Sequence, residues 1–467
     1  MYFPRTLSNR FAAWSAIGAL TVFVLAGCAG QDVAPLQPTA QRSQIEAVAP
    51  AVPVVQAPSE GPILSPYQLI PGLAGGANAV DGTPPTDASG LIRVGLLVPL
   101  SGPSAPIGEA LLSAAQMALF DVGDERFVLQ VYDTQGIPEG AQAAASLAIS
   151  QGAQLLLGPL FSAEVAAAAP DAAAAGVNII AFSTDPAIAS NRVFVMGFLV
   201  DEQVHRIIEY AGLEGHLNYA VLAPKSAYGK AVVESMTRHV SRMGGNVTDV
   251  AFYDPSGADL NAVVRELANF DQRRADLEEQ KAKLKGKEDE ASLLAFERLE
   301  LLDTVGEVGF DAILLPEQGV RLTQSASLLP FFDIDPERVQ LLGTMLWNAP
   351  GLGREPVMVG GLFPAPPLES TRRFSARYRD LHGINPPSIA NHGYDAVALA
   401  SVLAQSGLAA PFSAAAITAS SGFAGIDGIF RFMPGGLSQR GFAIMEVTRD
   451  GAVTISPALT TFDAALF

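Results

Sequence analysis

The feature that most constrains the fold is an alternation, from Leu91 onward, of strand-length apolar runs with helical segments rich in alanine and leucine. Runs typical of buried strands cover 92–97, 127–132, 154–157, 178–182 and 192–196. The segments between them that we predict to be helical are 108–120, 138–151 and 162–175. Because strands that alternate with helices form βαβ units, the sequence predicts a parallel sheet covered by helices.

A second series of the same kind comes next in the chain. Its predicted strands are 219–223, 246–252, 312–315 and 339–343, and its predicted helices are 230–242 and 260–268. Two series of βαβ units indicate two α/β lobes.

The charged segment 269–307 interrupts the second series. Apolar residues recur every seven positions in each half, namely Phe270, Leu277 and Leu284, then Leu294, Leu301 and Val308. This spacing predicts a helical hairpin with a narrow apolar seam that turns near Gly286. The hairpin is either a solvated excursion closed on itself or a docking surface for another protein.

The N-terminus has the order of a secretory signal. Arg5 and Arg10 precede the apolar run 11–25, and small residues follow it. The tetrad LAGC at 25–28 resembles the lipobox of bacterial lipoproteins, in which the cysteine is diacylated and begins the mature chain. The alternative is an uncleaved transmembrane anchor, but the apolar run of 15 residues is shorter than the roughly 20 that span a bilayer.

Cys28 is the only cysteine of the 467 residues, so a monomer has no disulfide. The chain is 49% hydrophobic and only 16% charged, which is enough apolar material for a large core. Its formal net charge is −18, and −20 without residues 1–27. An acidic chain argues against nucleic acid and anionic lipid as partners, so membrane attachment is expected through acyl chains.

Residues 31–90 differ in composition from the rest of the chain. They hold ten of the 33 prolines and few aromatic residues, so they cannot bury enough apolar surface to fold. We predict that residues 28–90 are a tether, with a reach of about 190 Å when fully extended.

We found no motif for catalysis or metal binding in the sequence. The histidines are scattered, and there is no His-Glu-x-x-His pair, nucleophile elbow, phosphate loop or dinucleotide fingerprint. We therefore expect a protein that is not an enzyme and that holds no metal or cofactor.

Several motifs occur in an order that resembles the leucine/isoleucine/valine-binding protein family, which has the type I periplasmic solute-binding fold. These motifs are IRVGLLVPLSGP at 92–103, Gly108, Asp133-Thr134 with EGA at 139–141, LGPLFS at 157–162, IAFST at 180–184, AYGK at 227–230, YDAV at 394–397 and GFAGIDG at 422–428 before Phe430. The resemblance covers about 91–447. It implies two Rossmann-like lobes joined by three crossovers and a cleft that closes around its ligand.

The resemblance also implies a set of ligand-binding residues at strand ends, where open α/β sheets bind ligands. The candidates are Ser101, Ser162, Ser183, Thr184, Tyr228, Glu317 and Trp347. Hydroxyls of the second and third loops bind the carboxylate and amine of an amino acid in this family. For the hydroxyls the alternative role is helix capping, and for Tyr228 and Trp347 it is hinge or core packing.

The resemblance predicts lobe 1 from 91–200 with 364–430, and lobe 2 from 201–363 with 431–460. Two features depart from the family pattern. Pro106-Ile107 stands where amino-acid binders often have an aromatic residue in the first loop, and the hairpin at 269–307 is absent from compact members. The pocket is therefore expected to take a different ligand or to have lost binding.

Two functions remain open, and the intact strand-end hydroxyl loops and the broad family resemblance favour the first. The first is a lipid-anchored receptor that delivers an amino acid or a peptide-like solute to an ABC importer. The second is suggested by a resemblance to activators of penicillin-binding proteins, outer-membrane lipoproteins that regulate peptidoglycan synthesis. The tether, the hairpin and Ala29, which lacks the aspartate that retains lipoproteins in the inner membrane, favour the second. Those activators also carry a helical-repeat domain, for which this chain has no room. Either function places the protein in the cell envelope, facing the periplasm.

Overall fold

The computed structural model describes residues 90–462. The predicted signal peptide, the lipidated Cys28 and the tether up to residue 89 lie outside the described residues.

The first series of strands forms a five-stranded sheet in the order β2-β1-β3-β4-β5, with every pair parallel. Its strands are β1 (Ile92–Val98), β2 (Phe127–Asp133), β3 (Leu155–Leu157), β4 (Asn178–Ala181) and β5 (Val193–Val195). Both faces of the sheet are buried. Leu96 and Val98 pack in one cluster, while Leu97, which points the other way, packs in another.

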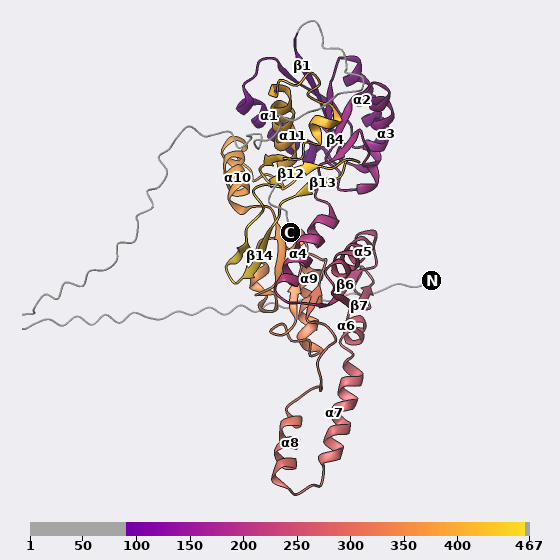
Figure 1. Ribbon diagram of the computed structural model, residues 1–467, viewed down its shortest axis with the longest axis vertical. Helices are drawn as coiled ribbons and strands as arrows, with labels where there is room; N and C mark the ends of the chain where they lie inside the picture. Colours follow the sequence, from indigo (N-terminus) through magenta and orange to yellow (C-terminus); the bar gives the residue numbers. More distant parts are fainter. Residues whose placement is uncertain (1–89, 463–467) are drawn as a thin grey trace, which may run out of the picture. The chain divides into compact units, whose positions relative to one another are not determined.

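Helices cover both faces of this sheet, and with it they form lobe 1 (Figure 1). They are α1 (Ala105–Val122), α2 (Pro138–Ser150), α3 (Ser162–Ala174), α10 (Leu368–His382), α11 (Ala390–Gln405) and α12 (Ala414–Ile417). The predicted strands and helices of the first series are confirmed, but α1 begins three residues before Gly108. Pro106 and Ile107 therefore lie in its first turn, where proline is well tolerated, and not in the preceding loop.

The second series forms a seven-stranded sheet in the order β15-β14-β10-β9-β8-β6-β7. Its strands are β6 (Asn218–Pro224), β7 (Asn246–Tyr253), β8 (Ala312–Leu314), β9 (Gln340–Leu342), β10 (Leu362–Ala365), β14 (Ala443–Thr448) and β15 (Gly451–Ser456). Strand β14 pairs antiparallel with β10, and β15 pairs antiparallel with β14, so these two strands form one edge of the sheet. The helices of this lobe 2 are α4 (Val200–Leu213), α5 (Ala227–Arg242), α6 (Leu260–Leu267) and α9 (Gly319–Phe331).

Short elements complete the two lobes. Single turns of 3₁₀ helix are η1 (Pro186–Ile188), η2 (Met345–Trp347), η3 (Leu352–Arg354) and η4 (Pro356–Met358). A small antiparallel sheet joins β11 (Phe423–Gly425), β12 (Gly428–Phe432) and β13 (Ser438–Arg440), and its Phe423, Phe430 and Phe432 pack in the core of lobe 1.

Strand pairing shows where the chain passes between the lobes, and it corrects two predicted boundaries. Phe430 pairs with Arg440, so lobe 1 continues through β13 and the boundary predicted at 430/431 is wrong. Ala365 pairs with Ala443 in the sheet of lobe 2, so the boundary predicted at 363/364 would divide β10. The crossovers therefore lie at 196–199, 366–367 and 441–442.

The segment 269–307 forms two helices, α7 (Phe270–Leu284) and α8 (Glu290–Glu300), which lie side by side (Figure 1). Gly286 takes a left-handed φ of 83° in the turn, as predicted. Leu277 is buried, but Leu294 and Leu301 are exposed, and the large apolar residues of α8 that are partly buried are Phe296 and Leu299. The second half of the predicted seam is wrong because α8 has two apolar stripes, and the spacing does not say which one faces α7.

Within residues 90–462, no helix is both long and apolar enough to cross a bilayer.

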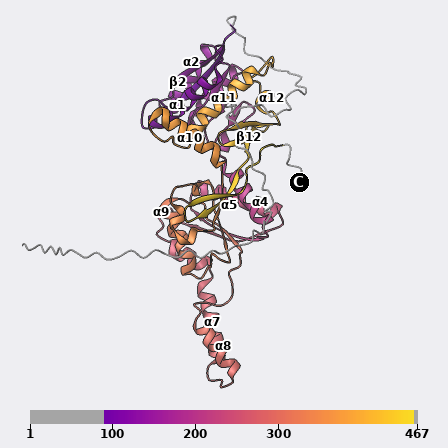
Figure 2. The ribbon, with the colours of Figure 1, turned by 90° about the vertical axis from the view of Figure 1, so that its left-hand side faces the viewer.

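The packing of α1 on α11 depends on a glycine (Figures 1 and 2 show the two helices adjacent). A Cβ on Gly393 would stand 2.2 Å from the carbonyl oxygen of Leu111, which the helix backbone holds in place. We predict that Gly393→Ala lowers the free energy of unfolding by about 1–3 kcal/mol, although alanine favours helices. Urea unfolding followed by circular dichroism measures this change.

Gly212 in α4 is the matched control. A Cβ there would meet the terminal methyl of Met243, which can rotate away, so Gly212→Ala is expected to change stability much less. Equal losses in the free energy of unfolding for the two variants would contradict the conclusion that α1 and α11 pack too closely for a Cβ at position 393.

Candidate functional site

The first strand-end loop of lobe 1 is held by a carboxylate. The Oδ1 atom of Asp133, at the end of β2, accepts hydrogen bonds from the backbone N–H groups of Leu100 (2.8 Å), Ser101 (3.2 Å) and Gln135 (2.8 Å). Burial alone would raise the pKa of Asp133, but these bonds and one from the Ser101 hydroxyl hold the pKa below its ordinary value. The hydroxyl of Ser101 is therefore already engaged by this loop.

The second loop, between β3 and α3, leaves its predicted hydroxyl unengaged. Glu164 is buried and accepts hydrogen bonds from the N–H of Phe161 (3.1 Å) and from the hydroxyl of Thr134 (2.8 Å). Burial raises the pKa of this carboxyl. Because Glu164 satisfies the helix start, Ser162 has no capping role, and its side chain has no hydrogen bond to any residue of 90–462.

The third loop, after β4, holds one engaged and one free hydroxyl. Ser183 is buried, and its oxygen accepts from the N–H of Asp185 at 3.1 Å. Thr184 is exposed and makes no side-chain hydrogen bond within the described part of the chain. The second and third loops are tied together, since the N–H of Phe182 donates to the carbonyl of Pro159 at 3.0 Å. Ser162 and Thr184 thus lie on two adjoining loops.

Polar side chains also gather at the strand ends of lobe 2. The hydroxyl of Tyr228, in the first turn of α5, lies 2.8 Å from that of Thr344, which follows β9. Glu317, which follows β8, accepts a hydrogen bond from the buried Tyr253 at the end of β7. Burial and the charge of Glu317 raise the pKa of Tyr228 to about 12. The charge of Glu317 acts on Tyr228, so these two candidate residues are electrostatic neighbours in lobe 2.

Trp347 does not join this group. Its indole is 1% exposed, packs in the core of lobe 2 near Phe363, and donates from Nε1 to the carbonyl of Leu315 at 3.0 Å. The core-packing alternative holds for this residue, because its one polar atom is satisfied inside the lobe.

The crossovers contain a buried charged cluster that the sequence did not reveal. Arg440, at the end of β13, is buried and donates from Nη2 to the carbonyl of Met196 in the first crossover at 2.5 Å. Its guanidinium lies 4.8 Å from the ring of Phe198 and 5.1 Å from that of Phe430. This residue thus joins the first crossover to the third.

Three carboxylates act electrostatically on this one guanidinium: Glu202, Asp395 and Asp427. Glu202 accepts from the backbone N–H of Arg440 at 3.4 Å, and Asp427 accepts from Asn391 at 2.7 Å. Burial raises the pKa of Glu202 to about 7, and it also raises the pKa of Asp427, which the neighbouring Asp395 increases further. His392 is buried beside Phe198, with a pKa of about 3 because burial disfavours its charged form.

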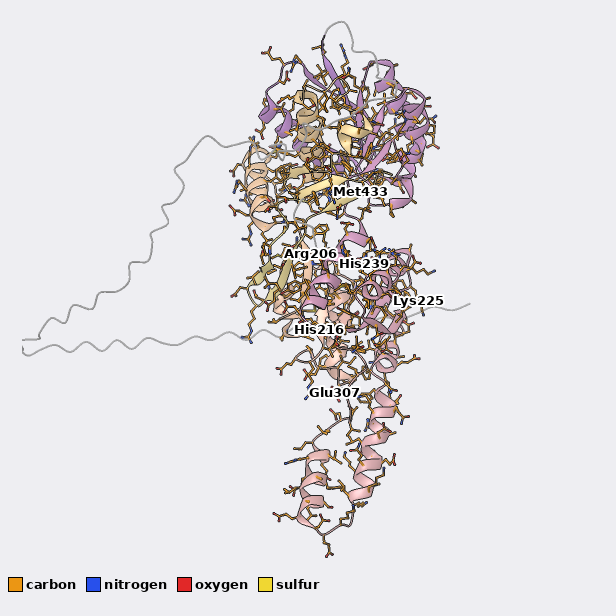
Figure 3. The ribbon with its side chains drawn as sticks, in the orientation of Figure 1. Arg206, His216, Lys225, His239, Glu307 and Met433 are labelled. Atoms are coloured by element: carbon orange, nitrogen blue, oxygen red, sulfur yellow. The ribbon has the colours of Figure 1, made fainter. Side chains whose placement is uncertain are left out.

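Arg206, on the second turn of α4, adds a second link across the crossovers (Figure 3). It donates from Nε to the carbonyl of Phe442 at 3.0 Å and from Nη2 to the hydroxyl of Ser456 at 2.7 Å. Two arginines therefore hold the chain where it passes between the lobes.

Sequence reasoning missed Thr344, Tyr253 and the whole Arg440 cluster. Asp395 and Asp427 belong to motifs that carry the family resemblance, but nothing local showed that both would be buried against an arginine. No group of three or more His, Cys, Asp or Glu side chains within residues 90–462 is arranged to hold a metal ion.

A model of the family described as periplasmic binding protein matches residues 91–452. Among curated proteins, one from Rickettsia prowazekii (strain Madrid E) is 26% identical over 178 residues, which is 38% of this chain and 47% of that protein. Penicillin-binding protein activator LpoA of Glaesserella parasuis serovar 5 (strain SH0165) is 25% identical over 162 residues, which is 34% of this chain and 27% of LpoA. The matched stretches are thus less than half the length of either relative.

Solved structures share the fold. A Rhodospirillum rubrum structure described as a branched-chain amino acid ABC transporter has a TM-score of 0.63 and 17% identity, and covers 78% of this chain and 100% of its own. A substrate-binding protein from Sphaerobacter thermophilus has a TM-score of 0.55 and 19% identity, with 79% and 98% covered. The predicted two-lobed α/β fold of type I periplasmic binding proteins is therefore confirmed.

The buried position of Glu202 predicts a pH dependence of stability. Because its pKa is about 7 in the folded state and 4.5 ordinarily, the folded protein binds more protons than the unfolded one between these values. Stability therefore falls as the pH rises from about 4.5 to 7. We expect Glu202→Gln to match the wild type near pH 4 and to exceed it by about 1–3 kcal/mol at pH 8, as measured by urea unfolding.

Glu214→Gln, at the exposed C-cap of the same helix, is the control for removing one negative charge. A wild-type pH profile in Glu202→Gln would show that this carboxyl is not the group that titrates.

Proposed function

Since the chain belongs to the periplasmic binding protein family, we propose that it is a non-catalytic, lipid-anchored solute-binding protein that captures an amino acid or a similar small solute for an ABC importer. The one observation that carries the proposal is that lobe 1 has unengaged hydroxyls at its strand ends, while lobe 2 has a carboxylate and a phenol at its own.

These groups suit the two charged ends of an amino acid. Ser162 and Thr184 can donate hydrogen bonds to a carboxylate, and Ser162 stands at the start of α3, where backbone N–H groups and the helix dipole favour an anion. Glu317 can accept from an ammonium group, and Tyr228 can contact the body of the ligand. Ser101 and Ser183 support the loops rather than the ligand, since their hydroxyls are already engaged.

Capture requires the two lobes to close on the solute, and three crossovers suit a hinge. The structure of LivJ from Streptococcus pneumoniae, in complex with isoleucine, shares this fold at a TM-score of 0.50 and 18% identity, and covers 79% of this chain and 100% of its own. A branched-chain amino acid is therefore our first candidate ligand.

The test is thermal unfolding of the protein against a panel of amino acids and muropeptides. A ligand at about 100 times its dissociation constant adds about 2.7 kcal/mol of stability. We expect one amino-acid class to raise the melting temperature by several degrees, and Ser162→Ala with Thr184→Ala to abolish that rise while the fold remains intact.

The matched control removes two exposed hydroxyls from α5, with Thr237→Ala and Ser241→Ala, and is expected to keep the response. An unchanged affinity in the Ser162/Thr184 variant would refute the site, and a flat response of the wild type to all amino acids would refute solute capture.

The envelope location rests on the N-terminal sequence. Cys28 would carry the acyl chains, and residues 28–90 would link the anchor to the α/β lobes on the periplasmic side. Ala29 favours the outer membrane over the inner one.

We predict that Cys28→Ala moves the protein from the membrane fraction to the soluble periplasm, because an acidic chain is repelled by anionic lipid and the proposed acyl chains on Cys28 would supply the attachment. Fractionation with metabolic labelling by an alkyne fatty acid measures this. Unaltered membrane association, with no label on the wild type, would point to an anchor that is not acyl.

A second function, activation of a penicillin-binding protein in peptidoglycan synthesis, is favoured by the match to LpoA and by the α7–α8 hairpin. A flat ligand panel together with binding to a purified peptidoglycan synthase would support it over the importer receptor.

A further inference from the structure

Four leucines in α8 and directly after it are exposed. Their exposed fractions are 52% for Leu293, 50% for Leu294, 87% for Leu301 and 47% for Leu302. Leu293 and Leu301 are eight residues apart, and Leu294 and Leu301 seven, so these three share one side of the helix. Leu301 keeps a helical backbone conformation at the C-cap. Large apolar side chains that gather in this way mark interaction surfaces more often than single exposed ones do.

Acidic side chains stand among these leucines. Glu297 lies one turn from both Leu293 and Leu301, and Glu300 lies on the same side. None of Glu297, Glu300 and Asp303 forms a salt bridge with any residue of the part of the chain that the structure describes. The lysines of α7 do not neutralise them, because Lys281 and Lys283 pair with Glu278 and Glu279 of their own helix.

The hairpin that carries this surface is held firmly at its base. Arg273 is buried and donates to the carbonyls of Gly306 (2.9 Å) and Asp333 (3.2 Å) and to the Asp333 carboxylate (3.1 Å). Glu307 pairs with Arg338 at 2.9 Å at the same end (Figure 3). A fixed base presents α8 in a constant direction, which lowers the entropy lost on binding.

We infer that the surface formed by Leu293, Leu294, Glu297, Glu300 and Leu301 docks a protein partner that presents an amphipathic helix with apolar anchors flanked by lysine or arginine. Apolar contacts supply the affinity, and opposite charges select and orient the partner. This role is separate from solute capture, since α8 lies outside the strand-end loops.

Arg298 also lies one turn from Leu294 and from Leu301, so the surface has two carboxylates to one guanidinium, and this net negative charge disfavours the other simple occupants. A second copy of this chain has a formal net charge of −18 and would bring like charges together, and anionic lipid would be repelled in the same way. A basic helix is the partner whose charge complements both the surface and the chain.

The test uses the full chain held in phosphatidylcholine nanodiscs and two synthetic helical peptides of about 18 residues. Both peptides carry leucines at every third or fourth position, and the remaining positions are lysine in one and glutamate in the other. We expect biolayer interferometry to detect the lysine peptide alone. Leu294→Ser with Leu301→Ser, and separately Glu297→Lys with Glu300→Lys, should each weaken its binding about tenfold or more.

The control pair, Leu213→Ser with Glu214→Lys, alters an equally exposed leucine and glutamate at the end of α4 and should leave binding unchanged. Equal binding of the glutamate peptide, or unchanged binding in both α8 variants, would overturn the inference. Light scattering of the full chain provides a further check. A wild-type dimer that becomes a monomer in the Leu294→Ser and Leu301→Ser variant would identify a second copy of the chain as the occupant. The change in melting temperature with amino acids is measured on the same variants. A failure of the docking inference is therefore distinguishable from a failure of solute capture.

Discussion

Both lobes are organised by sheets whose central strands are parallel and buried on both faces. A parallel strand can return to its sheet only through a crossover, and helices therefore cover each side of the β1–β5 sheet and of the sheet around β6, β8 and β9. All the parallel strands of one sheet then end at the same edge. Because those ends are the places where the chain leaves the core, polar groups such as Asp133, Thr184 and Glu317 collect there, and the candidate site follows from the topology.

Local pattern was sufficient for the regular elements. The apolar runs and the alanine-rich segments placed the strands and helices of the first series to within a few residues, since each is set by its own periodicity. The local sequence pattern was not sufficient where a contact between residues far apart in the chain determines the structure. Trp347 lies near a strand end, yet its indole turns into the core to reach the carbonyl of Leu315. The last boundary was set ten residues too early because β13 pairs back on β12, and Leu301 was assigned to the wrong stripe of α8.

The Arg440 cluster shows a different limit of sequence reasoning. An arginine, two aspartates and a histidine from separate parts of the chain are buried, with the partly buried Glu202 acting on the arginine, and no spacing in the sequence relates them. One positive charge cannot balance three carboxylates in a site with little water, so the cluster keeps protons that the same groups would lose in solution. Arg440 places this cluster beside the first and third crossovers, since its guanidinium bonds to the carbonyl of Met196.

The hairpin is inserted so that it leaves the sheet undisturbed. Strands β6 and β8 pair directly, although β7, α6, α7 and α8 separate them in the chain. The two ends of the hairpin meet at Arg273, which bonds to Gly306, so the segment between them closes on itself. Lengthening, shortening or exchanging that segment changes only a loop whose ends stay fixed. In evolution the sequence of the hairpin can therefore change independently of the two lobes. A new binding specificity can arise there without compensating substitutions in the α/β sheets and their helices.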